Sequence, residues 1–230
     1  NGSKTFITNG INSDLVIVVC RTTPEGGRRG LSLLIVERGM PGFERGRNLS
    51  KIGQHSADTA ELFFDDVQVP VRNLLGVEGR AFDYLAANLA QERMSMAVMG
   101  LAVSAVALRS TVDYVKQRRA FGRRIADFQN TKFVLAELAT SIEVTRPFID
   151  LSVTQLNEGC LSPSIAAMAK LHATELQNRV VDRCLQLFGG YGYTVEYPIG
   201  QFWTDARVST IYGGTSEIMK GIIAKHVLRD

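Results

Sequence analysis

The spacing of apolar residues changes near residue 80, and this change constrains the fold more than any other feature of the sequence. Before residue 78, apolar residues form short runs rich in β-branched side chains, such as 15–20 and 31–36, separated by glycine and proline. From about residue 80 they recur every three or four positions, the period of an amphipathic helix. Short strands without intervening helices predict an antiparallel sheet or part of a barrel, and long helices with short connections predict a bundle. The sequence therefore predicts an α+β chain, with a partial antiparallel β-domain at 1–78 and an all-α four-helix bundle at 79–230.

Four helices are expected in the second half, at about residues 80–117, 126–158, 163–188 and from 216 to the C-terminus. Gly159 suits the C-terminal cap of the second helix, and Pro147 is expected to bend it. Ser162 suits the N-terminal cap of the third helix. The chain opens with Asn1-Gly2, a pair typical of tight turns. A turn is therefore expected at residues 1–4, and it suggests that a longer protein precedes this point.

The composition argues against several classes of protein. The net charge of +3 and the pI near 8.8 do not indicate a nucleic-acid partner. Cys20, Cys160 and Cys184 are widely spaced and the histidines lie in separate segments, so neither a disulfide framework nor a metal site is expected. No apolar run approaches membrane-spanning length, so no membrane span is expected.

One acidic residue, Glu92, interrupts the apolar stripe of the first expected helix. The stripe consists of Phe82, Leu85, Leu89, Met96, Met99, Val103 and Val106. A carboxylate that faces a core without a partner is destabilised as an anion and takes up a proton more readily, as a general base must. Two structural interpretations remain open: an ion pair with Arg93, or a helix turned so that Glu92 is solvated.

Several short segments occur together in an order typical of one enzyme family. In the second half they are residues 118–122 (RRAFG), Gln129, 186–192 (QLFGGYG), 205–207 (DAR) and 211–218 (IYGGTSEI). In the first half they are residues 2–10 (GSKTFITNG), 58–62 (DTAEL) and 65–70 (DDVQVP). Each segment is unspecific by itself, but their order and spacing are specific. Over essentially its whole length the sequence resembles the acyl-CoA dehydrogenase family.

The resemblance implies an architecture and a set of partners. Members of this family have an N-terminal helical domain, a middle β-domain and a C-terminal four-helix bundle. Residues 1–78 would be the later part of the middle domain and 79–230 the bundle, with the N-terminal helical domain absent from this chain. The resemblance also implies an acyl-CoA substrate, FAD shared across a subunit interface of a homo-oligomer (dimer or tetramer), and electron-transfer flavoprotein as acceptor. The compartment would be the bacterial cytoplasm or the mitochondrial matrix.

The resemblance also assigns roles to residues by position. The cofactor-binding positions are Arg118, Phe121, Gln129, Gln186, Leu187, Phe188, Gly189, Gly190, Thr215 and Glu217. Arg118 corresponds to an arginine that contacts the FAD pyrophosphate of a neighbouring subunit, and a guanidinium fork matches phosphate oxygens. Arg93 and Tyr212 correspond to residues beside the substrate. The backbone N–H of Gly213 corresponds to a donor to the thioester carbonyl, an oxyanion-hole function.

The sequence departs from most of the family at Gly213, where most members carry the glutamate that acts as the base. The long-chain and isovaleryl-CoA branches place the base on the first bundle helix instead, at the position of Glu92, and residues 91–93 and 212–220 look most similar to the long-chain branch. The implied reaction is α,β-dehydrogenation of a fatty acyl-CoA, in which Glu92 removes the α-proton and a hydride passes from Cβ to N5 of FAD. Three alternatives remain open: an inactive fragment that clasps the cofactor and supports oligomerisation, an acyl-CoA oxidase that uses dioxygen, and isovaleryl-type specificity.

Overall fold

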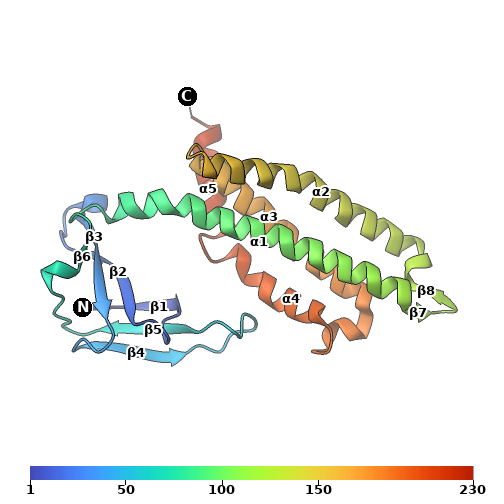
Figure 1. Cartoon of the computed structure of the whole chain (residues 1–230), viewed down its shortest axis with the longest axis horizontal. Helices are drawn as coiled ribbons and strands as arrows, with labels where there is room; N and C mark the ends of the chain where they lie inside the picture. The colour runs from blue at the N-terminus through green and yellow to red at the C-terminus, as the bar shows by residue number, and fades with distance from the viewer. Residues whose placement is uncertain (230) are drawn as a thin grey trace. The chain divides into compact units, whose positions relative to one another are not determined.

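The structure, a computed structural model, describes residues 1–229. Its internal contacts divide the chain into two compact units, Asn1–Asn88 and Leu89–Asp230, with the division inside the first long helix. The first unit contains strands β1 to β6 and the second contains most of the helical structure (Figure 1). The α+β class with antiparallel sheets followed by a helical bundle is confirmed.

The first unit is built from two antiparallel sheets. The sheet order β1-β5-β4 joins β1 (Gly2–Thr8), β5 (Thr59–Phe64) and β4 (Phe43–Asn48), and the order β2-β3-β6 joins β2 (Leu15–Arg21), β3 (Leu31–Glu37) and β6 (Leu74–Leu75). Val36, Phe43 and Leu62 form the core, and the ring of Phe43 stacks on that of Phe64 at 5.0 Å.

Two features of this unit differ from the sequence-based expectation. The turn expected at residues 1–4 is wrong, because Gly2, Ser3 and Lys4 pair with β5 in an antiparallel ladder. Pairing along a whole strand outweighs the local preference of one Asn-Gly pair. Strand β4 was not expected, because only Phe43 of this strand is buried, and its remaining residues lack the apolar alternation that marks a strand.

The second unit contains the bundle. Its long helices are α1 (Ala81–Gln117, which begins in the first unit), α2 (Gln129–Asn157), α3 (Pro163–Phe188) and α5 (Ser216–Val227). A short helix, α4 (Pro198–Ala206), and a small hairpin of β7 (Arg119–Ala120) and β8 (Arg123–Arg124) complete it. The expected caps are present: the Ser162 hydroxyl accepts from the N–H of Ile165 at 3.2 Å, and Gly159 has φ +72. Helix α4 was not expected.

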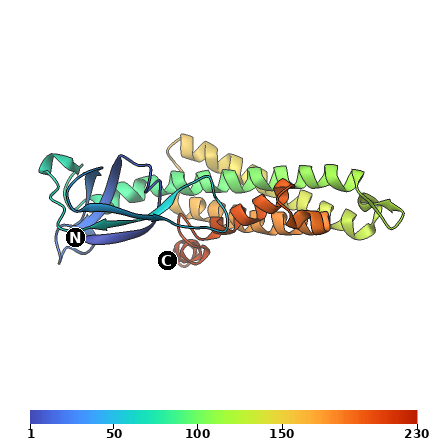
Figure 2. The ribbon, with the colours of Figure 1, turned by 90° about the horizontal axis from the view of Figure 1, so that it is seen from below.

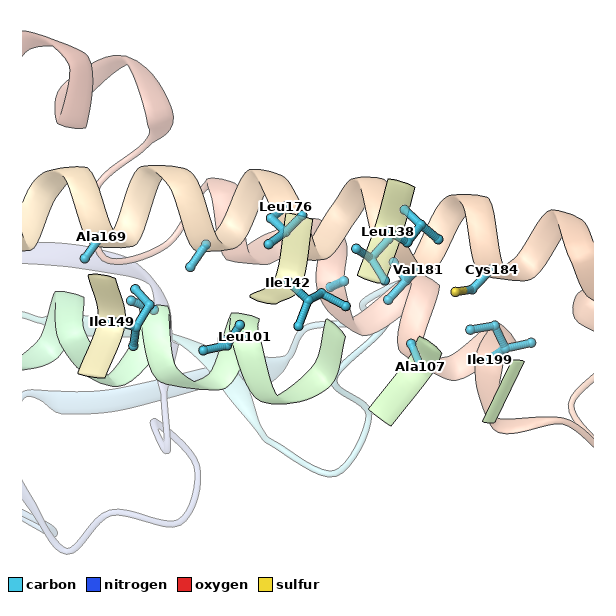
Figure 3. Packing of buried hydrophobic residues seen from close by; sticks show 14 of the residues in the cluster. Leu101, Ala107, Leu138, Ile142, Ile149, Ala169, Leu176, Val181, Cys184 and Ile199 are labelled. Atoms are coloured by element: carbon cyan, nitrogen blue, oxygen red, sulfur yellow. The ribbon is translucent and has the colours of Figure 1, made fainter. Parts of the chain in front are cut away.

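Small side chains form the buried seam of α1. Ala97, Leu101 and Ala107 pack against α2 and α3, and Figure 3 shows Leu101 and Ala107 beside Ile142, Leu176 and Val181. At Gly100 an added Cβ would lie only 2.8 Å from the carbonyl oxygen of Ala173, so the two helices approach closely there.

The apolar stripe expected on α1 is therefore wrong. Met99 is 50% exposed and Val106 is 44% exposed, and Glu92 lies on an exposed face and not in the core. The expected stripe consists of large apolar residues. The buried seam consists mainly of small residues, because these allow the helices to pack closely. Figure 2 shows α1 alongside the other bundle helices.

Helix α1 bears on the expectation that no apolar run is long enough to cross a membrane. By length and composition it is apolar enough to cross a membrane, with a mean hydropathy of 1.5 in its most apolar part. Of that part, 33% is buried inside the structure. Core helices of globular proteins can have the same length and apolar composition as membrane-spanning helices.

The buried thiol of Cys184 gives a first prediction. Burial raises its pKa from 9.0 to about 11, while a hydrogen bond with Thr111 opposes the shift. The raised pKa means that the neutral thiol contributes stability below pH 9.0, and that this contribution is lost as the pH rises towards about 11. At pH 8 an aromatic disulfide reagent is expected to label exposed Cys160 and to leave Cys184 unlabelled until the protein is denatured. Peptide mass spectrometry measures both rates, and equal labelling of the two thiols in the native protein would contradict the prediction.

Candidate active site

A pocket of about 690 Å³ lies between the end of α1, the β7–β8 hairpin, the start of α2 and the end of α3. We call it the hairpin pocket. Its lining includes most of the residues assigned to the cofactor by position: Arg118, Phe121, Gln186, Leu187, Phe188, Gly189 and Gly190. Gln129 does not line it, although its neighbours Phe128 and Asn130 do. The fold thus gathers two separate stretches of the sequence, residues 114–131 and 186–194, around one cavity.

The hairpin holds Phe121 in an unusual exposed position. Phe121 has φ +52 and Gly122 has φ +78, and two successive positive φ values are characteristic of the tight hairpin turn that matches the twist of its strands. The Phe121 side chain is 94% exposed, and its ring meets the edge of the Phe128 ring at 6.3 Å. A large apolar ring is therefore presented to the solvent on a rigid support.

Arg118 has a fixed backbone and an available guanidinium. Its N–H donates to the carbonyl of Tyr114 at 2.9 Å, and its carbonyl accepts from the N–H of Ile125 at 2.9 Å. The guanidinium carbon lies 5.1 Å from the centroid of the Tyr191 ring, a cation–π contact. Within residues 1–229 no carboxylate forms a salt bridge with Arg118. The positive charge is therefore available to a phosphate.

The floor and edge of the pocket differ in character. Phe188 is 6% exposed, and its ring stacks on the Tyr114 ring at 4.1 Å, so its side chain forms part of the floor. At Gly189 and Gly190 an added Cβ would meet nothing within 4 Å, so the backbone borders open space. An aromatic floor, an open glycine edge and an available guanidinium suit a ligand that carries flat rings and phosphates, as FAD does.

A second group of assigned residues lies elsewhere in the bundle, on a segment that we call the glycine loop (residues 212–215). Gly213 has φ +62 and Gly214 has φ +98, backbone conformations that residues other than glycine rarely adopt. The loop leads into α5, whose first turn is capped by the Thr215 hydroxyl, which accepts from the N–H of Ile218 at 3.3 Å. The half-buried Tyr212 begins the loop, and burial, followed by the charge of Asp205, raises the pKa of its phenol.

Met96 of α1 occupies the space that a side chain at position 213 would need. An added Cβ at Gly213 would lie 2.1 Å from Cε and 2.4 Å from Sδ of Met96. Glu92 lies one helical turn before Met96, and residues four apart share a helix face. The Glu92 carboxylate is therefore exposed on the same face of α1 as Met96, which contacts the glycine loop one turn later.

Glu92 and Arg93 point in different directions. Arg93 is 8% exposed, and its Nε is buried without a hydrogen-bond partner among residues 1–229. Burial lowers the pKa of Arg93, and the charge of Glu92 opposes this shift. The Glu92–Arg93 ion pair considered from the sequence is therefore a long-range attraction and not a salt bridge among the described residues.

Thr215 ends the glycine loop and Glu217 lies just after it in α5, and neither residue lines the hairpin pocket. Glu217 lies in the first turn of α5, where its own backbone N–H and the Thr215 hydroxyl, in that order, lower the pKa of its carboxyl. The residues assigned to the cofactor thus form two separate groups within the second unit.

One functional candidate was not identified from the sequence. Lys170, in the apolar run of residues 166–171, is 0% exposed, and its Nζ donates to the carbonyl oxygen of Gly214 at 2.7 Å. The position of a lysine inside an apolar helical stripe was the available signal.

The steric fit at Gly213 gives a second prediction. Gly213→Ala is expected to lower the free energy of unfolding by about 1–3 kcal/mol, because the residue would adopt a strained positive φ, while the end of the Met96 side chain moves aside. Gly221→Ala in α5 is the matched control, since a Cβ there meets nothing within 4 Å; it should stabilise the helix by about 0.5–1 kcal/mol. Urea unfolding followed by circular dichroism measures both values. Equal stability of Gly213→Ala and the unsubstituted protein would show that the loop adapts freely.

Comparison with known proteins places the chain in a family. Residues 79–228 match the model for the acyl-CoA dehydrogenase C-terminal domain, and residues 1–67 match that for the middle domain. The chain is 51% identical to the mitochondrial long-chain specific acyl-CoA dehydrogenase of Sus scrofa, over 100% of this chain and 54% of that protein. The chain therefore spans about half the length of the curated relatives it matches.

Solved structures agree with this comparison. The acyl-CoA dehydrogenase of Geobacillus kaustophilus superposes with a TM-score of 0.97 and 49% identity, over 99% of this chain and 60% of that one. A chain in a structure described as an electron transferring flavoprotein of Acidaminococcus fermentans superposes with a TM-score of 0.95 and 41% identity, over 100% of this chain and 60% of that one. Both the sequence and the fold, including the arrangement of the hairpin pocket and the glycine loop on one helical bundle, lead to the same conclusion: the chain belongs to the acyl-CoA dehydrogenase family.

Proposed function

We propose that the protein containing this chain catalyses FAD-dependent α,β-dehydrogenation of fatty acyl-CoA thioesters, with Glu92 as the base. The observation that carries the assignment of Glu92 is the contact between Met96 and Gly213. A side chain at position 213 would have to displace the end of the Met96 side chain and adopt a positive φ, and Glu92 is exposed one turn before Met96. Similarity to long-chain specific enzymes favours long-chain substrates.

The residues of the hairpin pocket and the glycine loop would hold FAD, which supplies the hydride acceptor when bound. Arg118 binds the pyrophosphate, while Phe121, Gln129 and the 186–190 segment border the remainder. Thr215 and Glu217 contact the FAD of their own subunit from the start of α5. The two groups would serve different FAD molecules, so the protein would act as a homo-oligomer. The separation of the two groups and the exposed ring of Phe121 support this arrangement.

The chain's own residues perform the proton chemistry. Glu92 accepts the proton from Cα of the thioester. The N–H of Gly213 donates to the thioester carbonyl oxygen, where negative charge develops. Arg93 and Tyr212 border the acyl-CoA.

The electrons would pass to electron-transfer flavoprotein, in a mitochondrial matrix or a bacterial cytoplasm. The similarity to mitochondrial and bacterial dehydrogenases, and to a chain from the electron transferring flavoprotein structure of A. fermentans, supports this acceptor and these compartments. The boundary between the middle domain and the bundle would lie at residues 78 and 79, just before α1 begins at Ala81.

Anaerobic titration of the full-length, FAD-loaded protein with acyl-CoAs of increasing chain length tests the proposal. Loss of the oxidised-flavin absorbance is expected, and it should be fastest with long-chain substrates. Reoxidation should require electron-transfer flavoprotein and should be slow in air. Absence of bleaching with every acyl-CoA would contradict the proposed function, and rapid reoxidation in air would identify an oxidase instead.

A further inference from the structure

Lys170 is a buried cation that the proposed mechanism does not use. It lies on α3, is 0% exposed and donates from Nζ to the Gly214 carbonyl at 2.7 Å. Within residues 1–229 it forms no salt bridge with a carboxylate, although the charges of Glu175 and Glu217 lie near enough to act on it. Because an ammonium loses much of its hydration when it is buried, this lysine costs free energy that an apolar residue would not. Such a residue calls for a function.

The acceptor of this hydrogen bond lies in the glycine loop, where no side chain at 213 or 214 restricts the backbone. Gly213 and Gly214 are consecutive glycines, and both have positive φ. Because a glycine samples more backbone conformations than any other residue, two together leave the orientation of the neighbouring peptide groups undetermined. The glycine loop therefore needs restraints from outside itself.

Helices restrain the loop from three sides. Met96 of α1 packs on Gly213, and Met219 of α5 packs on Gly214, where an added Cβ would lie 2.7 Å from Met219 Cε. These two contacts are apolar and leave rotation of the peptide groups open. Lys170 supplies the directional contact, because a hydrogen bond from a charged donor fixes where the Gly214 carbonyl points.

We propose that Lys170 is a positioning residue, which holds the Gly214 carbonyl and thereby fixes the direction of the Gly213 N–H towards the substrate carbonyl. This inference rests on the proposed function and deepens it. The Gly213 N–H is separated from the Gly214 carbonyl by two glycine residues, so a rotation at the carbonyl end changes the direction of the N–H. Since an oxyanion donor acts only when it is aimed at the developing charge, Lys170 would affect the reaction rate more than substrate affinity.

Lys170→Met in the full-length, FAD-loaded protein tests this role. Methionine has a similar length and no charge. The rate constant for flavin reduction at saturating acyl-CoA is expected to fall by about 10–100-fold, because the oxyanion donor is misdirected but still present. The dissociation constant of the acyl-CoA should change by less than about threefold. Hydrogen exchange of the backbone amides of residues 213–215 should accelerate at least about tenfold, whereas exchange along α3 should not change.

Lys220→Met is the matched control. Lys220 lies on α5, is exposed, and approaches Glu175 at 3.9 Å, so this change removes a nearby positive charge without touching Gly214. Wild-type rates of flavin reduction and of amide exchange are expected for it. A similar loss in both variants would show that the charge matters and not the hydrogen bond, and it would overturn the proposal.

The result that overturns the inference directly is a Lys170→Met protein with the wild-type reduction rate and protected loop amides. Should Lys170→Met fail to fold, Lys170→Arg keeps a cationic donor but moves it, and partial loss of rate with faster exchange at 213–215 is expected. In Lys170→Arg, a wild-type rate of flavin reduction despite unprotected amides at 213–215 would also overturn the proposal, because the loop would then be loose without any effect on the reaction. If the unsubstituted protein does not reduce its flavin with any acyl-CoA, the proposed function fails, and the exchange measurement still decides whether Lys170 restrains the loop.

Discussion

Replacing Glu92 with glutamine in the full-length, FAD-loaded protein is expected to lower the rate of flavin reduction by acyl-CoA by about 10²–10⁴-fold, the usual contribution of a positioned general base. Glutamine keeps the size and polarity of the side chain but does not accept the α-proton. Because Glu92 is exposed and forms no salt bridge among the described residues, its replacement leaves the bundle core intact. Binding of FAD and of acyl-CoA should therefore be retained.

The measurement is an anaerobic rapid-mixing experiment that follows the oxidised-flavin absorbance. Asp113→Asn is the control, because Asp113 is an exposed carboxylate on the same helix, far along the sequence from the glycine loop. It should reduce flavin at the wild-type rate. A Glu92→Gln protein that bleaches as fast as the wild type would place the base elsewhere and leave Glu92 a solvated surface residue.

Replacing Arg118 with alanine is expected to weaken FAD binding by about 10–150-fold, which corresponds to the loss of a charged hydrogen bond worth about 1.5–3 kcal/mol. Among the described residues no carboxylate forms a salt bridge with this guanidinium, so its fork is available to the pyrophosphate. Its contact with the Tyr191 ring, at 5.1 Å, also orders the edge of the hairpin pocket. Flavin fluorescence during dilution of the full-length protein measures the dissociation constant.

Two further variants make this result specific. Arg109→Ala removes an exposed arginine from the same helix and should leave FAD affinity unchanged. Arg118→Lys keeps the charge without the bidentate geometry and should fall between alanine and the wild type. An Arg118→Ala protein with wild-type affinity would mean that the hairpin pocket does not hold the phosphates.

Local chemistry explains which elements were predictable. The C-terminus of α2 follows from Gly159 and the N-terminus of α3 from Ser162, because capping depends only on a residue's immediate neighbours. The buried face of α1 depends on how closely another helix approaches, and Ala97 and Gly100 reveal this only once α3 is in place. Strand β4 depends on pairing with β5, which its own residues do not specify.

The candidate site divides in the same way. The resemblance assigned Arg118, Phe121 and the 186–190 segment to one function, and the fold brings them to one pocket. Apolar periodicity alone pointed Glu92 into the core, which is wrong, and its exposed position depends on the same seam of α1. Lys170 was missed because its partner is a backbone carbonyl 44 residues away. Every residue carries such a carbonyl, so no side chain in the sequence identifies the acceptor.

The contact between Met96 and Gly213 has a consequence for how the position of the base can change during evolution. A glutamate at 213 would need the end of the Met96 side chain to move, because an added Cβ would lie 2.1 Å from its Cε and 2.4 Å from its Sδ, so a smaller residue at 96 would favour it. Shortening Met96 first would leave a void beside the loop and would bring no new base in return. Positions 96 and 213 are therefore coupled: changing either one alone is unfavourable, whereas changing both together avoids the clash and the void. Such coupling tends to keep a lineage on the helix-borne base once Met96 and Gly213 are both in place.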